Sequence, residues 1–260
     1  MKTKIIKTLS AGALFMASAA GFAAPVLPDF VVTPGSVPGV TDTAPFTADK
    51  ITGNYNEAFT VTGANTFITK AYWDAGQFVK NDGATPLTAK LTQLGNSYGL
   101  YAVFDSVGTF ATSADGSVFT GGTGSIKIYI DAALDTTKAL GATGADDIVI
   151  GDNADDYLIA TSDYLIAAAG TQSAGLANGD FKFVFGDFTL TPEGASFFTS
   201  PSPFYFGLDL AGQFNSFEIS GNQQINGSAD AWFGVPEPAG LALIGFALSG
   251  LGLFGRRRKS

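Results

Sequence analysis

Hydrophobic and polar residues alternate over much of the chain between residues 51 and 234. In residues 125–131 three isoleucines fall on one face of an extended chain, and Lys127 and Tyr129 fall on the other. A period of two residues is typical of a strand with one buried face. The pattern therefore predicts strands. Further strand-like runs cover 58–62, 66–73, 87–93, 98–105, 181–185, 188–191, 204–210, 214–220 and 230–233.

Turn-forming pairs separate many of these runs. Gly121-Gly122 and Asn226-Gly227 are two of them, and such pairs favour tight turns between strands. An apolar strand face needs a second layer to cover it, and many short strands with frequent turns are typical of β-sandwiches. We therefore expect an all-β chain with a single β-sandwich or jelly-roll-like ectodomain over residues 51–234.

Two segments depart from the strand pattern. Residues 24–50 carry several widely spaced prolines, so we expect an extended lead-in to the domain. Residues 162–169 contain Leu165, Ile166 and three alanines, which favour a short helix. No other change in composition divides the ectodomain into smaller units.

The last 26 residues, 235–260, have three parts. Pro236, Glu237 and Pro238 come first, and an apolar run of 17 residues, 239–255, follows them. At about 1.5 Å per residue such a run forms a helix of roughly 25 Å, near the lower limit for crossing a bilayer. A basic cluster would stay on the cytoplasmic side and stop transfer of the chain. The cluster consists of Arg256, Arg257, Arg258 and Lys259.

The other end of the chain has the organisation of a secretory signal peptide. Three lysines lie among the first seven residues, an apolar and small-residue core covers 9–22, and Gly21 and Ala23 are small residues at the two positions that a signal peptidase reads. We predict cleavage after Ala23. A retained N-terminal membrane helix is the alternative. The signal peptide at 1–23 indicates that the chain is exported.

The ordered tail resembles the PEP-CTERM sorting signal of Gram-negative bacteria. Pro236, Glu237 and Pro238 match the motif, and the apolar run and basic cluster match the rest of the signal. The resemblance implies transient insertion in the inner membrane, where an exosortase processes the chain near the motif. It also implies release of the ectodomain toward the cell surface or the extracellular matrix. A plain C-terminal membrane anchor is the alternative.

Short motifs within the ectodomain are similar to those of flocculation-associated PEP-CTERM proteins. This second resemblance implies a non-enzymatic matrix protein that is exported with exopolysaccharide and helps cells to aggregate into flocs or biofilm. It brings no catalytic residues with it. The motifs are Tyr72-Trp73-Asp74, Ile128-Tyr129-Ile130-Asp131, Asn178-Gly179-Asp180-Phe181 and Gly212-Gln213-Phe214-Asn215-Ser216-Phe217.

Charge is distributed unevenly between the ends and the ectodomain. Seven of the 14 basic residues lie in the two terminal signals, whereas 22 of the 23 acidic residues lie between them. Residues 24–235 therefore carry a formal charge near −15 and contain no arginine. Such a surface repels phosphate backbones, so we expect no nucleic-acid partner.

The chain contains no cysteine and no histidine. Disulfides are therefore excluded, as are Ser-His-Asp catalysis, Cys-His catalysis, haem attachment and ordinary zinc sites, because each requires a thiol or an imidazole. Carboxylate chemistry or a Ser-Lys pair remains, and no motif for either is present. We expect no catalytic residues and no enzymatic activity.

One acidic stretch is a candidate metal site. Clustered carboxylates repel one another, and a hard divalent cation such as Ca²⁺ relieves that repulsion. The spacing only weakly resembles a calcium-binding repeat, so a solvated acidic loop is the alternative. Asp131 and Asp135 form a second and weaker cluster of the same kind. The candidate calcium ligands are Asp146, Asp147, Asp152, Asp155 and Asp156.

Aromatic residues offer a second kind of site. The chain has 23 phenylalanines, and their alternation favours a role in the core. Tyrosine and tryptophan have polar edges and suit a sugar-binding platform better. Any such platform would draw on Tyr72, Trp73, Tyr98, Tyr101, Tyr205 and Trp232.

Three functions remain open on the sequence alone. The first is a non-enzymatic surface or matrix protein that is associated with exopolysaccharide. The second is a carbohydrate-binding adhesin or lectin-like module, with calcium assisting the site. The third and least favoured is a polysaccharide-degrading enzyme that uses a pair of carboxylates.

Overall fold

The computed structural model describes residues 27–41, 43–215 and 217–234, and these residues form mostly β-strands. The all-β class is confirmed. The predicted signal peptide and the predicted C-terminal sorting signal lie outside the described residues. Within the described part of the chain, no helix has the length and apolar character needed to cross a membrane.

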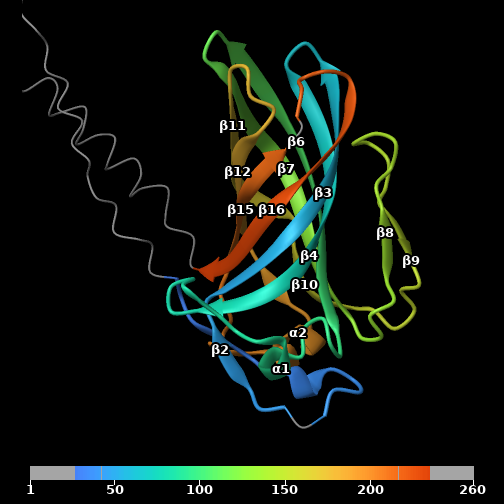
Figure 1. Cartoon of the computed structure of the whole chain (residues 1–260), viewed down its shortest axis with the longest axis vertical. Coiled ribbons are helices and arrows are strands. Elements are labelled where there is room, and N and C mark those ends of the chain that lie inside the picture. The colour runs from blue at the N-terminus through green and yellow to red at the C-terminus, as the bar shows by residue number, and fades with distance from the viewer. Residues whose placement is uncertain (1–26, 42, 216, 235–260) are drawn as a thin grey trace, which may run out of the picture.

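Eight antiparallel strands form one sheet that closes on itself (Figure 1). The order is β11-β12-β15-β16-β3-β4-β6-β7, and β7 pairs back with β11. The result is a barrel whose strands have 8 to 16 residues. Their bounds are β3 Lys50–Gly63, β4 Thr66–Lys80, β6 Gly99–Ser113, β7 Gly116–Asp131, β11 Tyr164–Ser173, β12 Gly179–Gly186, β15 Gly207–Asn215 and β16 Asn222–Gly234.

Strand β7 closes the barrel by changing partners along its length. Its first half, from Gly116 to Gly121, pairs with β11, and its second half, from Ile126 to Ile130, pairs with β10. Strand β10 covers Tyr157–Ser162 and pairs in turn with β13, Thr189–Leu190. Because its second half pairs with β10, β7 also positions the end of the segment that connects the two strands.

The barrel corrects the expected sandwich or jelly roll. Alternation along a strand shows that one face is buried, but it does not show what covers that face. Here the covering layer is the opposite wall of the same curved sheet, as in other small barrels whose inward side chains fill the interior.

Two expected turns lie inside strands instead. Gly121-Gly122 belongs to β7, next to the register shift between Val107 and Gly108 of β6. Asn226-Gly227 lies within β16. A Cβ atom on Gly227 would collide with the carbonyl oxygen of Gln213 and would lie 2.7 Å from the ring of Tyr55, so the glycine permits close approach rather than a reversal of the chain.

The local expectations for two segments are also wrong. Residues 164–169 belong to strand β11, where Leu165 and Ala168 are buried, and not to a helix. Within the run 87–93, which was expected to be a strand, residues Ala89–Thr92 form helix α1. Alanine-rich segments favour helix intrinsically, but pairing with β12 on one side and β7 on the other overrides that preference in β11.

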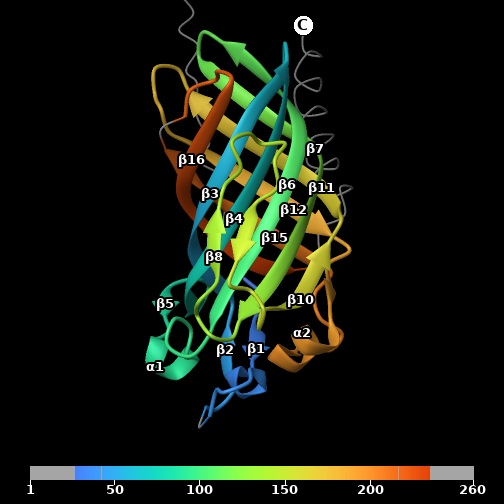
Figure 2. The ribbon, with the colours of Figure 1, turned by 90° about the vertical axis from the view of Figure 1, so that its right-hand side faces the viewer.

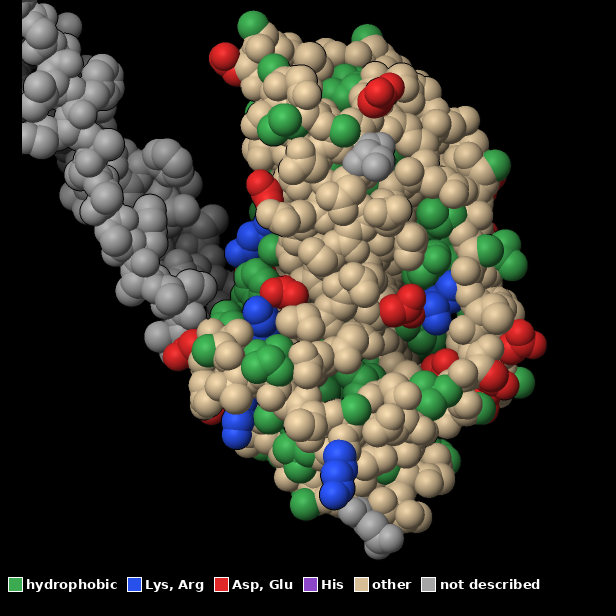
Figure 3. All heavy atoms as spheres, in the orientation of Figure 1, with side chains coloured by type: hydrophobic (Ala, Val, Ile, Leu, Met, Phe, Trp, Pro, Cys, Tyr) green, Lys and Arg blue, Asp and Glu red, His purple; other side chains and the backbone are tan. Residues whose placement is uncertain are grey.

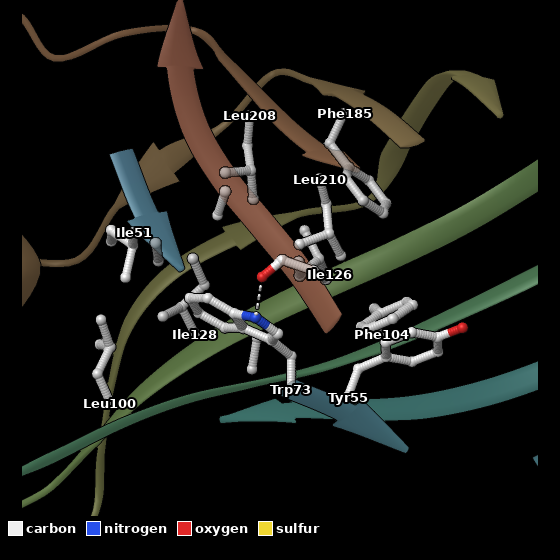
Figure 4. Packing of buried hydrophobic residues seen from close by; sticks show 14 of the residues in the cluster. Ile51, Tyr55, Trp73, Leu100, Phe104, Ile126, Ile128, Phe185, Leu208 and Leu210 are labelled. Atoms are coloured by element: carbon white, nitrogen blue, oxygen red, sulfur yellow. Dashed lines mark hydrogen bonds between the residues drawn. The ribbon is translucent and has the colours of Figure 1, made fainter. Parts of the chain in front are cut away.

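The half of the barrel interior nearer the base is densely filled with aromatic and aliphatic side chains (Figure 4). Trp73 of β4 is 1 % exposed, and its indole N–H donates to the carbonyl oxygen of Ala229 at 2.9 Å. The expectation that phenylalanines fill the core is met by most of them. Other side chains in this part of the core are Ile51, Tyr55, Phe104, Ile126, Ile128, Phe185, Leu208 and Leu210.

A small second layer closes the base of the barrel (Figure 2). Strands β1, β2 and β14 form a three-stranded sheet there, and Phe30, Val32, Phe46 and Ala48 of β1 and β2 belong to the same hydrophobic core as the barrel. The elements of the base and its surroundings are β1 Phe30–Val32, the 3-10 helix Pro34–Ser36, β2 Phe46–Ala48, β5 Thr85–Pro86, α1 Ala89–Thr92, α2 Pro192–Phe197 and β14 Phe198–Ser200.

The two ends of the described chain meet at this base. The ring centroids of Phe30 and Phe233 are 5.0 Å apart, and both side chains are completely buried. Ala23 precedes Phe30 by seven residues, and Pro236 follows Phe233 by three. Both processing points expected from the sequence are therefore only a few residues away from one end of the barrel.

Candidate functional site

Between β7 and β10 the chain leaves the barrel and forms a flap, residues 132–156. The flap contains a two-stranded sheet of β8, Thr137–Ala139, and β9, Val149–Gly151. It lies along the outer face of the barrel (Figures 1 and 2). This single excursion carries every acidic residue of the predicted calcium set.

Polar contacts hold the flap against the strands beneath it. The Lys138 ammonium lies 3.1 Å from the carboxylate of Asp74 and 4.5 Å from the centroid of the Tyr101 ring. Farther along, the backbone N–H of Gly144 donates to the Thr60 hydroxyl at 2.8 Å. The flap is therefore anchored near its start and at its middle.

Three carboxylates converge where the flap joins the barrel. Asp131, Asp155 and Asp156 each place one oxygen within 4.8 Å of the others. The pairing of β7 with β10 explains why, because Ile130 stands opposite Tyr157 and the residues just beyond this pair must lie side by side. This group is called the acidic triad below.

Hydrogen bonds orient two members of the triad. Asp131 is 6 % exposed and accepts backbone N–H bonds from Leu134 at 2.6 Å and from Thr136 at 3.2 Å. Asp156 accepts hydrogen bonds from the Tyr101 hydroxyl at 2.6 Å and from the Thr136 hydroxyl at 2.8 Å. Both carboxylates are thus held in place by donors of the surrounding chain.

Negative charge accumulates around the triad. Partial desolvation, followed by the nearby carboxylates of Asp155, Asp131 and Asp152, raises the pKa of Asp135 above its usual value. Burial, together with the hydrogen bond to Asp156, raises the pKa of the Tyr101 hydroxyl, which therefore stays protonated and remains a donor. Oxygen ligands on a short, negatively charged loop are what a hard cation such as Ca²⁺ requires.

The structure divides the predicted calcium ligands into separate groups. Asp155 and Asp156 join Asp131, which the sequence assigned to a different cluster. The link between the two clusters is the pairing of β7 with β10, which is not visible in the local sequence. Asp152 contributes to the negative charge around Asp135 and lies at hydrogen-bond distance, 3.5 Å, from Thr137.

The other two predicted ligands have different partners. Asp146 accepts hydrogen bonds from the backbone N–H and the hydroxyl of Thr143, both at 2.9 Å. Asp147 forms an ion pair with Lys70 of β4, which lowers the pKa of the Asp147 carboxyl. Asp147 therefore ties the flap to β4, Asp146 is bonded within the flap itself, and neither residue joins the triad.

A groove of about 400 Å³ separates part of the flap from the barrel. Its floor includes Lys127, Asp105 and Ser125, and Ser125 donates a hydrogen bond to Asp105. Its roof includes Ile148 and Ile150 of the flap. In the space-filling view, hydrophobic, basic and acidic side chains surround a hollow on this side of the molecule (Figure 3). A groove of this size and mixed lining suits a small polar ligand or a segment of a chain.

The aromatic candidates do not form one platform. Trp73, Tyr98 and Tyr101 are each 3 % exposed or less. Tyr205 is near the base, where its hydroxyl donates to the carbonyl oxygen of Asp29 at 2.7 Å. Trp232 faces outward on β16 with the Lys182 ammonium 5.4 Å from its ring centroid. The exposed aromatic surface is thus scattered over different elements.

The predicted sorting and processing residues lie outside the described residues. They are Ala23, Pro236, Glu237, Pro238, Arg256, Arg257, Arg258 and Lys259.

Comparison of the chain with protein-family models, with curated proteins and with solved structures gives no match.

Proposed function

We propose that this chain is an exported, non-enzymatic surface or extracellular-matrix protein that associates with exopolysaccharide and promotes cell aggregation. The observation that carries the proposal is the ordered tail, in which Pro236-Glu237-Pro238 precedes an apolar run and a terminal basic cluster. In this account a signal peptidase removes residues 1–23. An exosortase then processes the chain near the tail motif while the apolar run is in the inner membrane.

The arrangement of the barrel supports this route. Phe30 and Phe233 are in contact at the base, so the signal peptide and the tail both connect to the same end of a compact body. A body tethered at one end presents its opposite end and its flap away from the membrane. The acidic surface favours solubility after release, and antiparallel pairing stabilises the barrel without disulfides.

Deleting residues 236–260 tests the sorting and the aggregation together. We expect the truncated protein to miss its normal destination at the cell surface or matrix, and we expect cells that carry it to lose aggregation. A variant with Lys259→Arg, which keeps the charge of the basic cluster, serves as the control and should behave as wild type. Normal delivery of the truncated protein with persistent flocs would overturn both parts of the proposal.

The proposal includes a structural calcium ion at the acidic triad. We expect Ca²⁺ at 100 times its dissociation constant to raise the free energy of unfolding by about 2.7 kcal/mol. Asp156→Asn should remove most of that gain, whereas Asp115→Asn, in the β6–β7 turn, should keep it. The gain is measured as the difference between two free energies of unfolding, one from urea unfolding with Ca²⁺ and one from urea unfolding with chelator. An equal gain in Asp156→Asn, or no gain in the wild type, would contradict the site.

A carbohydrate-binding adhesin is the second candidate, and the groove under the flap favours it. Its hydroxyl, carboxylate and ammonium groups are the donors and acceptors that bind sugar hydroxyls. The producer's own polysaccharide is the appropriate probe. If the protein binds this polysaccharide and Ser125→Ala weakens the binding, the result would support this candidate. Shortening of the polysaccharide during incubation would instead indicate the third candidate, a carboxylate-based enzyme.

A further inference from the structure

The half of the barrel interior away from the base contains a cavity of about 60 Å³. Seven phenylalanines line it, and they come from five of the barrel strands, β3, β4, β7, β12 and β15, and from the segment after β15. Phe59, Phe119 and Phe217 form one side, with ring centroids 5.0 to 6.1 Å apart. This cavity is distinct from the groove under the flap, because it lies inside the sheet and the groove lies outside it.

Glu57 is the one charged residue among those that line the cavity. It lies on β3 between two inward-facing residues, Tyr55 and Phe59, so its side chain also points into the barrel. The Thr69 hydroxyl of β4, itself 1 % exposed, donates a hydrogen bond to the Glu57 carboxyl. Burial raises the pKa of Glu57 to about 7, although the hydrogen bond from Thr69 lowers it.

Unlike Glu57, two other polar groups of the interior have no protein partner. The Tyr55 hydroxyl and the Ser106 hydroxyl are buried and make no hydrogen bond within the described chain. Ser106 borders the cavity wall, because its hydroxyl oxygen is 3.0 Å from the position that a Cβ atom on Gly121 would occupy. Buried polar groups without partners carry a free-energy cost, so the barrel interior beside the cavity is not purely apolar.

The chemistry of the cavity selects a class of ligand. A carboxylate surrounded by aromatic rings suits an organic ammonium ion, because the carboxylate balances the charge and the ring faces attract the cation. A metal ion is disfavoured, since Ca²⁺ requires six to eight oxygens and the cavity wall offers the Glu57 carboxyl and the Thr69 hydroxyl. A neutral apolar ligand would leave the Glu57 carboxylate without compensation.

The volume restricts the size of that ion. The cavity is partly open, and its volume of about 60 Å³ suits a group of a few heavy atoms. We propose that the barrel interior binds a small alkylammonium ion, with the Glu57 carboxylate as counter-ion and the surrounding phenylalanine rings as an aromatic cage. This inference does not depend on the sorting tail or on calcium.

Calorimetry and NMR with ethylammonium chloride test the site, with ethanol as a neutral probe of similar size. We expect saturable binding of ethylammonium by the wild type, with ligand methyl resonances shifted by the nearby rings, and no binding of ethanol. Affinity should be weaker at pH 5 than at pH 8, because only the ionised Glu57 carboxylate pairs with the cation.

Two variants separate the cavity from the acidic surface. Glu57→Gln should weaken ethylammonium binding by at least about tenfold, whereas Glu193→Gln, an equal change of charge on exposed helix α2, should leave it unchanged. Phe181→Leu should weaken binding to a smaller extent by removing one aromatic face. Unchanged affinity in Glu57→Gln, or no saturable binding by the wild type, would overturn the inference.

Discussion

Trp73→Ala is expected to lower the free energy of unfolding by about 3 to 5 kcal/mol, the usual range for removing a large aromatic side chain from a core. The indole is 1 % exposed and donates a hydrogen bond across the interior to the carbonyl oxygen of Ala229. The substitution therefore leaves a cavity and an unpaired carbonyl in the middle of the barrel. The total free energy of unfolding of a domain is only about 5 to 15 kcal/mol, so the variant should lose a large fraction of its stability.

Trp232→Ala is the matched control for this prediction. Trp232 is on the outer face of β16, partly exposed, with Lys182 beside its ring. Removing it should cost about 1 kcal/mol or less, because water can occupy the vacated surface. Urea unfolding followed by fluorescence measures both variants. Similar decreases in the free energy of unfolding for Trp73→Ala and Trp232→Ala would mean that Trp73 is not packed in the barrel interior.

Glu57→Gln is expected to change how stability depends on pH. Burial raises the pKa of the Glu57 carboxyl from 4.5 to about 7 in the folded barrel. The folded state therefore binds the proton more tightly than the unfolded state does. The contribution of the Glu57 carboxyl to the free energy of unfolding is therefore fully present below pH 4.5, and it is lost as the pH rises through 7. The loss amounts to about 3 kcal/mol between pH 4 and pH 8.

The glutamine variant keeps the size of the side chain but cannot ionise, so it should not show this loss. Relative to the variant, the wild type should become less stable by about 3 kcal/mol as the pH rises from 4 to 8. Exposed carboxylates affect both proteins equally, and Glu193→Gln should follow the wild type. Parallel pH profiles for wild type and Glu57→Gln would show that the Glu57 carboxyl is solvated rather than enclosed in the barrel.

Local alternation predicted many of the strands but not the way they associate. The expected strands at 66–73 and 98–105 overlap β4 and β6, which run to Lys80 and Ser113. These strands extend through small and polar residues, which give little periodic signal on their own. Closure of the barrel depends on the pairing of the first half of β7 with β11, and this pairing between distant segments has no counterpart in local pattern.

The candidate sites show the same division between local and long-range information. The acidic stretch was recognised, and Asp155 and Asp156 belong to the triad. Their partner Asp131 comes from the far side of the flap. Glu57 was not recognised, because a single glutamate in a polar-looking strand becomes notable only when phenylalanines from other strands surround it.

The most direct test of the central claim is the intact mass of the protein recovered from the cell surface or matrix. The account predicts a chain that begins at Ala24, after cleavage at Ala23, and ends near Pro236-Glu237-Pro238, without the apolar run and the basic cluster. A recovered chain that still ends in Arg256 to Ser260, or that retains residues 1–23, would contradict sorting by an exosortase and export by a signal peptide respectively.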